Sequence, residues 1–171
     1  MRNVKLALVA LSLAALLAAC GGGDEGVVVE EKDPSPSGQE ASITVLAADD
    51  ADLNGIYSTD DINLNNVTKV NPIGGDPETC RFKFDGPEQA GSGRIMGGDI
   101  RYIPGTENLH SAFIAINGVE FELQGTTGVR VDRANDEVDF TAAVLTSTQG
   151  SGDEITLTGS IPMRPDRPEG C

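Results

Sequence analysis

The alternation of apolar and polar residues around Asn117-Gly118 constrains the fold of this chain more than any other feature. Asn-Gly is the pair most typical of a two-residue β-hairpin turn. A hairpin folded about this pair aligns apolar residues on one face: Ile116 opposite Val119, Ile114 opposite Phe121 and Ala112 opposite Leu123. Glu120 and Glu122 then face outward. Because a shift of one residue would bury both carboxylates, the pattern fixes the register.

A second hairpin is predicted to turn through residues 133–136. Its inner face pairs apolar residues, Val131 with Val138 and Val129 with Phe140. Its outer face pairs Arg130 with Asp139. A cross-strand ion pair of this kind contributes about 0.2–1 kcal/mol.

The same period of two recurs elsewhere in the chain. Residues 80–84 and 154–161 alternate regularly, and residues 94–103 form a strand in which Gly97-Gly98 predicts a bulge or a tight bend. No stretch keeps a helical period over three turns. We therefore expect an all-β fold over residues 42–171, as a single antiparallel β-sandwich or a small β-barrel of about eight strands.

The N-terminal segment has the pattern of an export signal. Basic residues Arg2 and Lys5 precede an apolar run of thirteen residues, 6–18, which as a helix would rise only about 20 Å, less than a ~30 Å hydrocarbon core. Such a run indicates a signal peptide, not a membrane span. The run ends in Leu17-Ala18-Ala19-Cys20, which resembles the lipobox of bacterial lipoprotein precursors. The alternative is a plain signal peptide cleaved ahead of a cysteine.

The lipoprotein resemblance implies a location and a membrane anchor. It makes residues 1–19 the lipoprotein signal peptide and Cys20 the acylated first residue of the mature chain, with chains such as palmitate holding it in the membrane. In this family the following residue biases sorting, and Gly21 in place of Asp implies the outer membrane of the cell envelope, facing the periplasm or the cell surface. Residues 20–41 are rich in Gly, Asp, Glu, Pro and Ser and predict a flexible tether.

The charge of the chain excludes one class of partner. It has 27 acidic against 12 basic side chains, a net charge of −15. Removal of residues 1–19 takes away two basic side chains and no acidic one, which leaves 10 against 27 and a net charge of −17. This excess of acid argues against nucleic acid, because phosphates need cationic side chains.

Two cysteines remain once Cys20 is assigned to the lipid. An exported chain lies in an oxidising compartment, so we expect a Cys80–Cys171 disulfide. It would close a loop of roughly ninety residues, which the chain-entropy model values at about 4–5 kcal/mol.

Residues 50–61 are a candidate metal site. They follow the calcium-loop template D-x-[DN]-x-[DN]-G and resemble the calcium loops of dockerin modules, with Asp61 at the last ligand position. The oxygen donors would come from this set: Asp50, Asp52, Asn54, the Ile56 carbonyl and Ser58. The flanking segments lack helical character, however, so an acidic loop ahead of a strand is the preferred interpretation, and no metal ligand is assigned.

The sequence offers few candidate catalytic residues. His110 is the single histidine, and the hairpin register predicts a structural place for it at the rim of the core, beside Ala112 and Ile114. One histidine and two paired cysteines do not supply a zinc site. A carboxylate enzyme acting on sugars is disfavoured because the chain has two Tyr and no Trp. We assign no catalytic residue and no cofactor.

These observations predict a lipid-anchored cell-envelope protein whose non-catalytic β domain has a structural or binding role, with another envelope protein as its candidate partner. Two alternatives stay open. One is a calcium-binding module formed by residues 50–61. The other is a small-ligand carrier, because Leu53-Asn54-Gly55-Ile56-Tyr57 resembles the entry strand of lipocalin-like barrels, with Tyr57 in place of the usual Trp.

Overall fold

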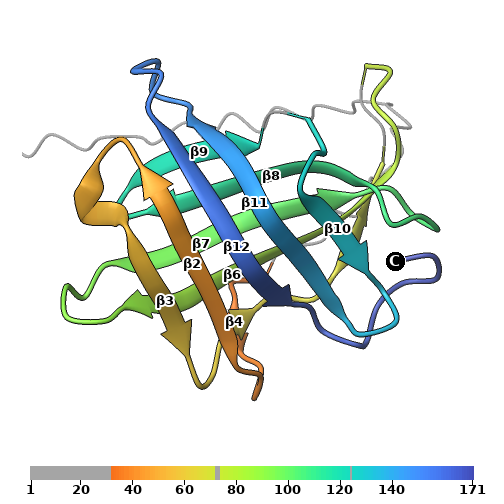
Figure 1. Cartoon of the computed structure of the whole chain (residues 1–171). Coiled ribbons are helices and arrows are strands. Elements are labelled where there is room, and N and C mark those ends of the chain that lie inside the picture. The colour runs from red at the N-terminus through yellow and green to blue at the C-terminus, as the bar shows by residue number, and fades with distance from the viewer. Residues whose placement is uncertain (1–31, 72–73, 124) are drawn as a thin grey trace, which may run out of the picture. The chain divides into compact units, whose positions relative to one another are not determined.

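The computed structural model describes residues 32–171, apart from 72–73 and 124. The described part is all-β, with one short 3-10 helix, η1 (Ala51–Leu53). The predicted fold class is confirmed (Figure 1). The strands are β1 (Ser35–Pro36), β2 (Ala41–Ala48), β3 (Gly55–Thr59), β4 (Asn63–Leu64), β5 (Thr68–Val70), β6 (Thr79–Gln89), β7 (Ile95–Tyr102), β8 (Leu109–Ile116), β9 (Val119–Leu123), β10 (Val129–Asp132), β11 (Glu137–Ser147) and β12 (Glu154–Pro162).

Eight of the strands close into an antiparallel barrel. Their order is β6-β3-β2-β12-β11-β9-β8-β7, and pairing of β6 with β7 completes the ring. The remaining strands are short additions, with β10 on β11, β4 and β5 on β6, and β1 on β4. Of the two expected architectures, the barrel is therefore the correct one. Closure leaves the eight main strands without an unpaired edge of full length.

The barrel interior is a packed core. Every one of the eight strands contributes at least one apolar side chain that is at most 2% exposed. These inward side chains include Ile43, Tyr57, Phe82, Phe84, Ile100, Ile114, Phe121, Leu145, Leu157 and Ile161. An eight-stranded barrel is narrow enough for such side chains to fill.

Both predicted hairpins are confirmed in register. Ile116 pairs with Val119 and Ile114 with Phe121 across the Asn117-Gly118 turn, whose two residues have φ of 50° and 84°. These positive values are those of the turn type that Asn-Gly favours. In the second hairpin, Arg130 pairs with Asp139 as expected.

The bulge expected at Gly97-Gly98 lies on the partner strand. The pairing of β6 with β7 shifts register between Asp85 and Glu88, directly beside Gly97, whereas the pairing of β7 with β8 is regular through both glycines. Gly98 instead makes room for a neighbour, because a Cβ there would lie 2.6 Å from the Phe84 ring and 2.5 Å from the Phe113 carbonyl oxygen. The glycine therefore serves close packing and not a change of strand direction.

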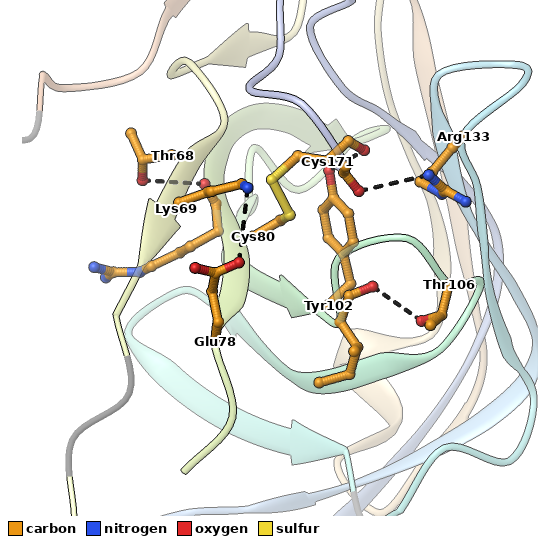
Figure 2. Close-up of a disulfide and its surroundings, with 11 residues drawn as sticks. Thr68, Lys69, Glu78, Cys80, Tyr102, Thr106, Arg133 and Cys171 are labelled. Carbon is orange, nitrogen blue, oxygen red and sulfur yellow. Dashed lines mark hydrogen bonds and ion pairs between the residues drawn. A yellow bond between two sulfur atoms is a disulfide. The ribbon is translucent and has the colours of Figure 1, made fainter.

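One end of the barrel is tied by the predicted disulfide, which is confirmed. Cys80 on β6 and Cys171 have Cα atoms 5.6 Å apart and are joined by an S–S bond. Figure 2 shows the Tyr102 ring beside this bond, where its hydroxyl donates to the Cys171 carbonyl oxygen at 2.9 Å. Burial raises the pKa of Tyr102 to about 12, against the opposing charges of Arg167 and Arg133.

The packed part of the chain includes residues that the sequence assigns to the tether. β1 pairs with β4, and the Arg164 guanidinium donates to the Ser35 and Pro36 carbonyl oxygens at 2.9 and 3.1 Å. Cys20 and the rest of the predicted signal and tether, up to residue 31, lie outside the described residues. Among the described residues, no helix has the length and apolar character that crossing a bilayer requires.

Candidate functional site

Residues 50–61, the candidate calcium loop, do not surround one position at which an ion could bind. The Asp50 carboxylate accepts a hydrogen bond from the Asp52 backbone N–H at 3.0 Å and caps helix η1. Asp61 accepts from the backbone N–H groups of Ser37 and Gly38 at 3.0 and 2.8 Å. Between these two aspartates runs the extended strand β3, which at about 3.3 Å per residue separates its ends by roughly 13–16 Å. The structure does not bring the predicted ligands together.

A different acidic cluster does come together, on β10 and β11. Oxygens of Asp132, Glu137 and Asp139 lie within 4.8 Å of one another. The Arg130 guanidinium, however, lies among them, hydrogen-bonded to Asp132 and 3.2 Å from Asp139. An ion-pair network explains this cluster without a metal.

Asp132 is the best-held member of that network. Burial would raise its pKa, but hydrogen bonds from the backbone and side chain of Asn135, together with the Arg130 guanidinium, hold the pKa below its usual value. The carboxylate also accepts from the Ala134 backbone N–H at 3.1 Å. Asp132 thus fixes the turn between β10 and β11.

His110 is not at the rim of the core. Leu109 and Ala112 point inward, whereas His110 is exposed. The pairing of β7 with β8 shifts register between Arg101 and Tyr102, so the alternation slips by one position at the start of β8. The prediction that His110 lies on the same side as Ala112 and Ile114 is therefore wrong, because a bulge lies between His110 and the regular part of the hairpin.

The most distinctive surface is the outer side of β3, β2, β12 and β11, which lie next to one another at the front of Figure 1. Most of its outward side chains carry hydroxyl or aliphatic groups, and the charged ones, Glu137, Asp139 and Glu154, lie near the ends of β11 and β12. We call this surface the uncharged face and define it by these residues: Ser42, Thr44, Leu46, Ile56, Ser58, Thr141, Ala142, Val144, Thr156, Thr158 and Ser160.

Strand register arranges this face in rows. Ser160, Ser42 and Ser58 lie opposite one another on β12, β2 and β3, and the row ends at Asp139 on β11 and Glu88 on β6. The next row contains Thr158, Thr44 and Ile56. Carboxylates therefore border the face but do not enter it.

The uncharged face also gathers exposed aliphatic side chains. Leu46, Ile56 and Val144 are 53%, 56% and 42% exposed. Ile56 pairs with Thr44, and Leu46 lies two residues after Thr44, so Leu46 and Ile56 are diagonal neighbours on adjacent strands. Val144 pairs with Thr156. Ile95, 50% exposed, is a comparable side chain at the start of β7, away from this face.

Two hollows join along the row of serines. The larger, about 720 Å³, extends from Arg130 and Thr141 to Ser42 and Ser160. The smaller, about 300 Å³, continues from Ser42 and Ser160 to Ser58 and Asp60. Because they share Ser42 and Ser160, they form one shallow trough across the strands.

The backbone explains why the sheet is hollowed here. β11 is bulged between Phe140 and Ala143, and Ala142 has a φ of 48°. Opposite the bulge, Gly159 has a φ of 126°, and a Cβ on it would lie closer than 3.0 Å to the Ser42 carbonyl oxygen. Together they coil the sheet sharply and lower its outer surface.

The alternation of residues 154–161 in the sequence fits Thr156, Thr158 and Ser160 on one side of a strand, but it did not identify the face. Comparisons with protein-family models, with curated proteins and with solved structures find no match to the chain.

Proposed function

We propose that this chain is a lipid-anchored protein of the bacterial cell envelope, whose non-catalytic barrel binds a macromolecular partner through the uncharged face. The observation that carries the anchor is Leu17-Ala18-Ala19-Cys20 behind a basic start and an apolar run. The Cys80–Cys171 disulfide supports export, because such bonds persist in oxidising compartments.

The proposed anchor is strong enough to hold the protein by itself. Each buried methylene contributes about 0.8 kcal/mol, so several acyl chains on Cys20 give stable attachment. Gly21 favours the outer membrane in this proposal. The excess of acidic side chains on the barrel repels an anionic lipid surface, so the anchor, and not the barrel, makes the membrane contact.

A binding role for the barrel is supported by the chemistry of its surface. Ser and Thr hydroxyls, which donate and accept hydrogen bonds, line the middle of the trough, and charged residues lie at its two ends, Glu40 and Asp60 at one and Arg130 and Asp139 at the other. The charged groups at its β10 end, Arg130 and Asp139, are paired with each other. Such groups suit recognition, whereas catalysis needs a nucleophile and a base held together.

Neither alternative from the sequence is favoured over this proposal, although an eight-stranded barrel is compatible with a small-ligand carrier. The calcium module needs Asp50 and Asp61 on one ion, and strand β3 separates them. The small-ligand carrier needs an open interior, whereas apolar side chains from all eight barrel strands pack there. The hollow of about 80 Å³ near Leu53 and Phe121 is small beside ordinary ligand pockets of ~300–1,000 Å³.

Metabolic labelling with a fatty acid tests the anchor. The full chain, expressed in a Gram-negative host, should take up label and sediment with the outer membrane. Cys20→Ala should lose the label, and Gly21→Asp should move the labelled protein to the inner membrane. Label that persists in Cys20→Ala, or an unlabelled parent chain, would overturn the proposal. Thiol titration of each variant checks that Cys80 and Cys171 remain paired.

A further inference from the structure

We propose that the uncharged face is the contact between two copies of this chain. The inference rests on the proposed lipid anchor, because the anchor places the copies in one plane. It begins from charge. With a net charge of −15, two copies repel each other, and a contact that brings their carboxylates together costs free energy.

The uncharged face removes this obstacle. Its rows hold Ser, Thr and aliphatic residues across four strands. Asp139 and Glu88 lie at the ends of the serine row, and Glu40 and Asp60 line the outer end of the smaller hollow, so that all four carboxylates would stay at the solvated rim of a contact. Two copies meeting face to face would therefore bury no unpaired carboxylate, which is the arrangement that favours association.

The aliphatic side chains supply a driving force. Leu46, Ile56 and Val144 keep about half of their surface exposed. Burial of apolar surface contributes roughly 25 cal/mol per Å². These three residues lie on β2, β3 and β11 of one face, with β12 between β2 and β11, so a single partner surface can cover them together.

The shape of the face suits an identical partner. A two-fold contact uses the same patch on both copies, so the patch must be complementary to itself. A sheet surface of small hydroxyl and aliphatic groups meets that condition, because it carries no charge that must find its opposite. Sheets pack face to face about 10 Å apart, and Ser and Thr allow that approach.

The size of the face explains the need for the anchor. Four strands at ~4.8 Å spacing are about 15 Å across, which places the contact at the small end of protein interfaces. Such a contact is weak between freely diffusing molecules. Attachment to one membrane raises the effective concentration of the copies and makes the weak contact sufficient.

Crosslinking in cells tests this contact in the full, anchored chain. Single cysteines are introduced by Ser42→Cys, Thr44→Cys or Thr158→Cys, and the cells are treated with a short bifunctional maleimide. The matched control is Ile95→Cys, at a residue that is 50% exposed but lies on β7. We expect covalent dimers of this chain from the face cysteines and monomers from the control.

A second pair of variants tests whether the face drives the contact. In the Thr44→Cys background, Leu46→Glu should lower the dimer yield by about tenfold, because it places a carboxylate opposite its own copy. Ile95→Glu, a matched change at a similarly exposed residue, should leave the yield unchanged.

The outcomes separate this inference from the proposed function. A chain that is labelled with fatty acid but gives no dimer, or equal dimer from the control, overturns the self-contact and leaves the anchor standing. An adduct with a different protein at the face cysteines also overturns it. An unlabelled chain overturns the anchor and this inference with it. Mass spectrometry of the adduct identifies the partner and confirms that Cys80 and Cys171 stay paired.

Discussion

The two outer walls of the barrel differ although their inner sides are alike. The wall of β3, β2, β12 and β11 presents the uncharged face. The wall of β6 and β7 presents a charged face, which we define by Arg81, Lys83, Asp99 and Arg101. There Arg81 Nε donates to Asp99 Oδ2 at 2.9 Å, and Arg101 Nε lies 3.5 Å from Asp99 Oδ1.

This difference teaches which residues folding constrains. Inward positions on both walls are apolar because they form one core, as Ile43 on β2 and Phe82 on β6 illustrate. Outward positions carry no such demand, so both walls fold with opposite surface chemistry. The contrast between the faces therefore concerns interactions with the surroundings, and that is why we place the proposed contact on one of them.

The largest expected effect follows from removing the disulfide that links the two walls. Cys80 lies on β6 of the charged wall, and Cys171 follows β12 of the uncharged wall. The Cys80→Ala/Cys171→Ala double variant should lose about 4–5 kcal/mol of unfolding free energy, because its unfolded state regains the freedom of a loop with a sequence separation of 91.

Urea unfolding of the exported chain, with the reduced parent protein as the control, measures this loss. The double variant and the reduced parent should unfold at similar urea concentrations. A double variant within about 1 kcal/mol of the oxidised parent would mean that packing alone joins the walls.

A glycine in each wall gives the next largest effect. Gly159→Ala should cost about 3 kcal/mol or more, because its Cβ meets the Ser42 and Ile43 backbone and its φ is 126°. Gly98→Ala should cost somewhat less, because a Cβ there meets the Phe113 carbonyl oxygen and the Phe84 ring but Gly98 does not have a positive φ.

Chemical unfolding compares both variants with Gly105→Ala. Gly105 has a φ of 72° with open space around it, so its substitution should cost only about 1 kcal/mol. Equal losses in Gly159→Ala and Gly105→Ala would show that backbone strain, and not crowding, sets the cost at Gly159.

The local parts of this fold were predictable from the sequence. The hairpin at Asn117-Gly118 needed only alternation and one turn signal, and the Arg130–Asp139 pair followed from its register. The disulfide followed from counting cysteines once Cys20 was set aside. The two hairpin predictions depend on residues that are close in the chain, and the disulfide prediction depends on two cysteines for which no other cysteine remains as a partner.

The pairing of strands that are distant in the sequence was not predictable. A sandwich and a barrel have the same hairpins and differ in which distant strands meet, such as β2 with β12, where Ala48 pairs with Ile155. The uncharged face depends on that same pairing. The bulge that exposes His110 lies in the hairpin of β7 and β8, where Tyr102 pairs with Leu109, and the alternation of β8 alone does not reveal it.

A smaller effect should separate the faces by their response to salt. Asp99→Asn should cost about 1–2 kcal/mol, because the side chains of Asp99 and Arg81 are only 19% and 21% exposed and share hydrogen bonds. Thr158→Val, which removes a 3.2 Å hydrogen bond to the Phe140 carbonyl oxygen on the uncharged face, should change stability by about 0.5 kcal/mol or less.

Urea unfolding at low and high salt measures both variants. The loss in Asp99→Asn should shrink at high salt, and the change in Thr158→Val should not. A salt-insensitive loss in Asp99→Asn would assign its role to hydrogen bonding alone.

The smallest expected effect lies at the β10 border of the uncharged face and depends on pH. The pKa of Asp132 is held below its usual value of about 3.9, so its charged form stabilises the folded state. That stability is present above the usual pKa and is lost as the pH falls through the lower folded value. Asp132→Asn keeps an oxygen that can accept from Asn135 but removes the charge beside Arg130. Parent and variant should therefore differ in unfolding free energy at neutral pH and converge in acid, and a gap that is constant with pH would show that the ion pair at this border contributes nothing.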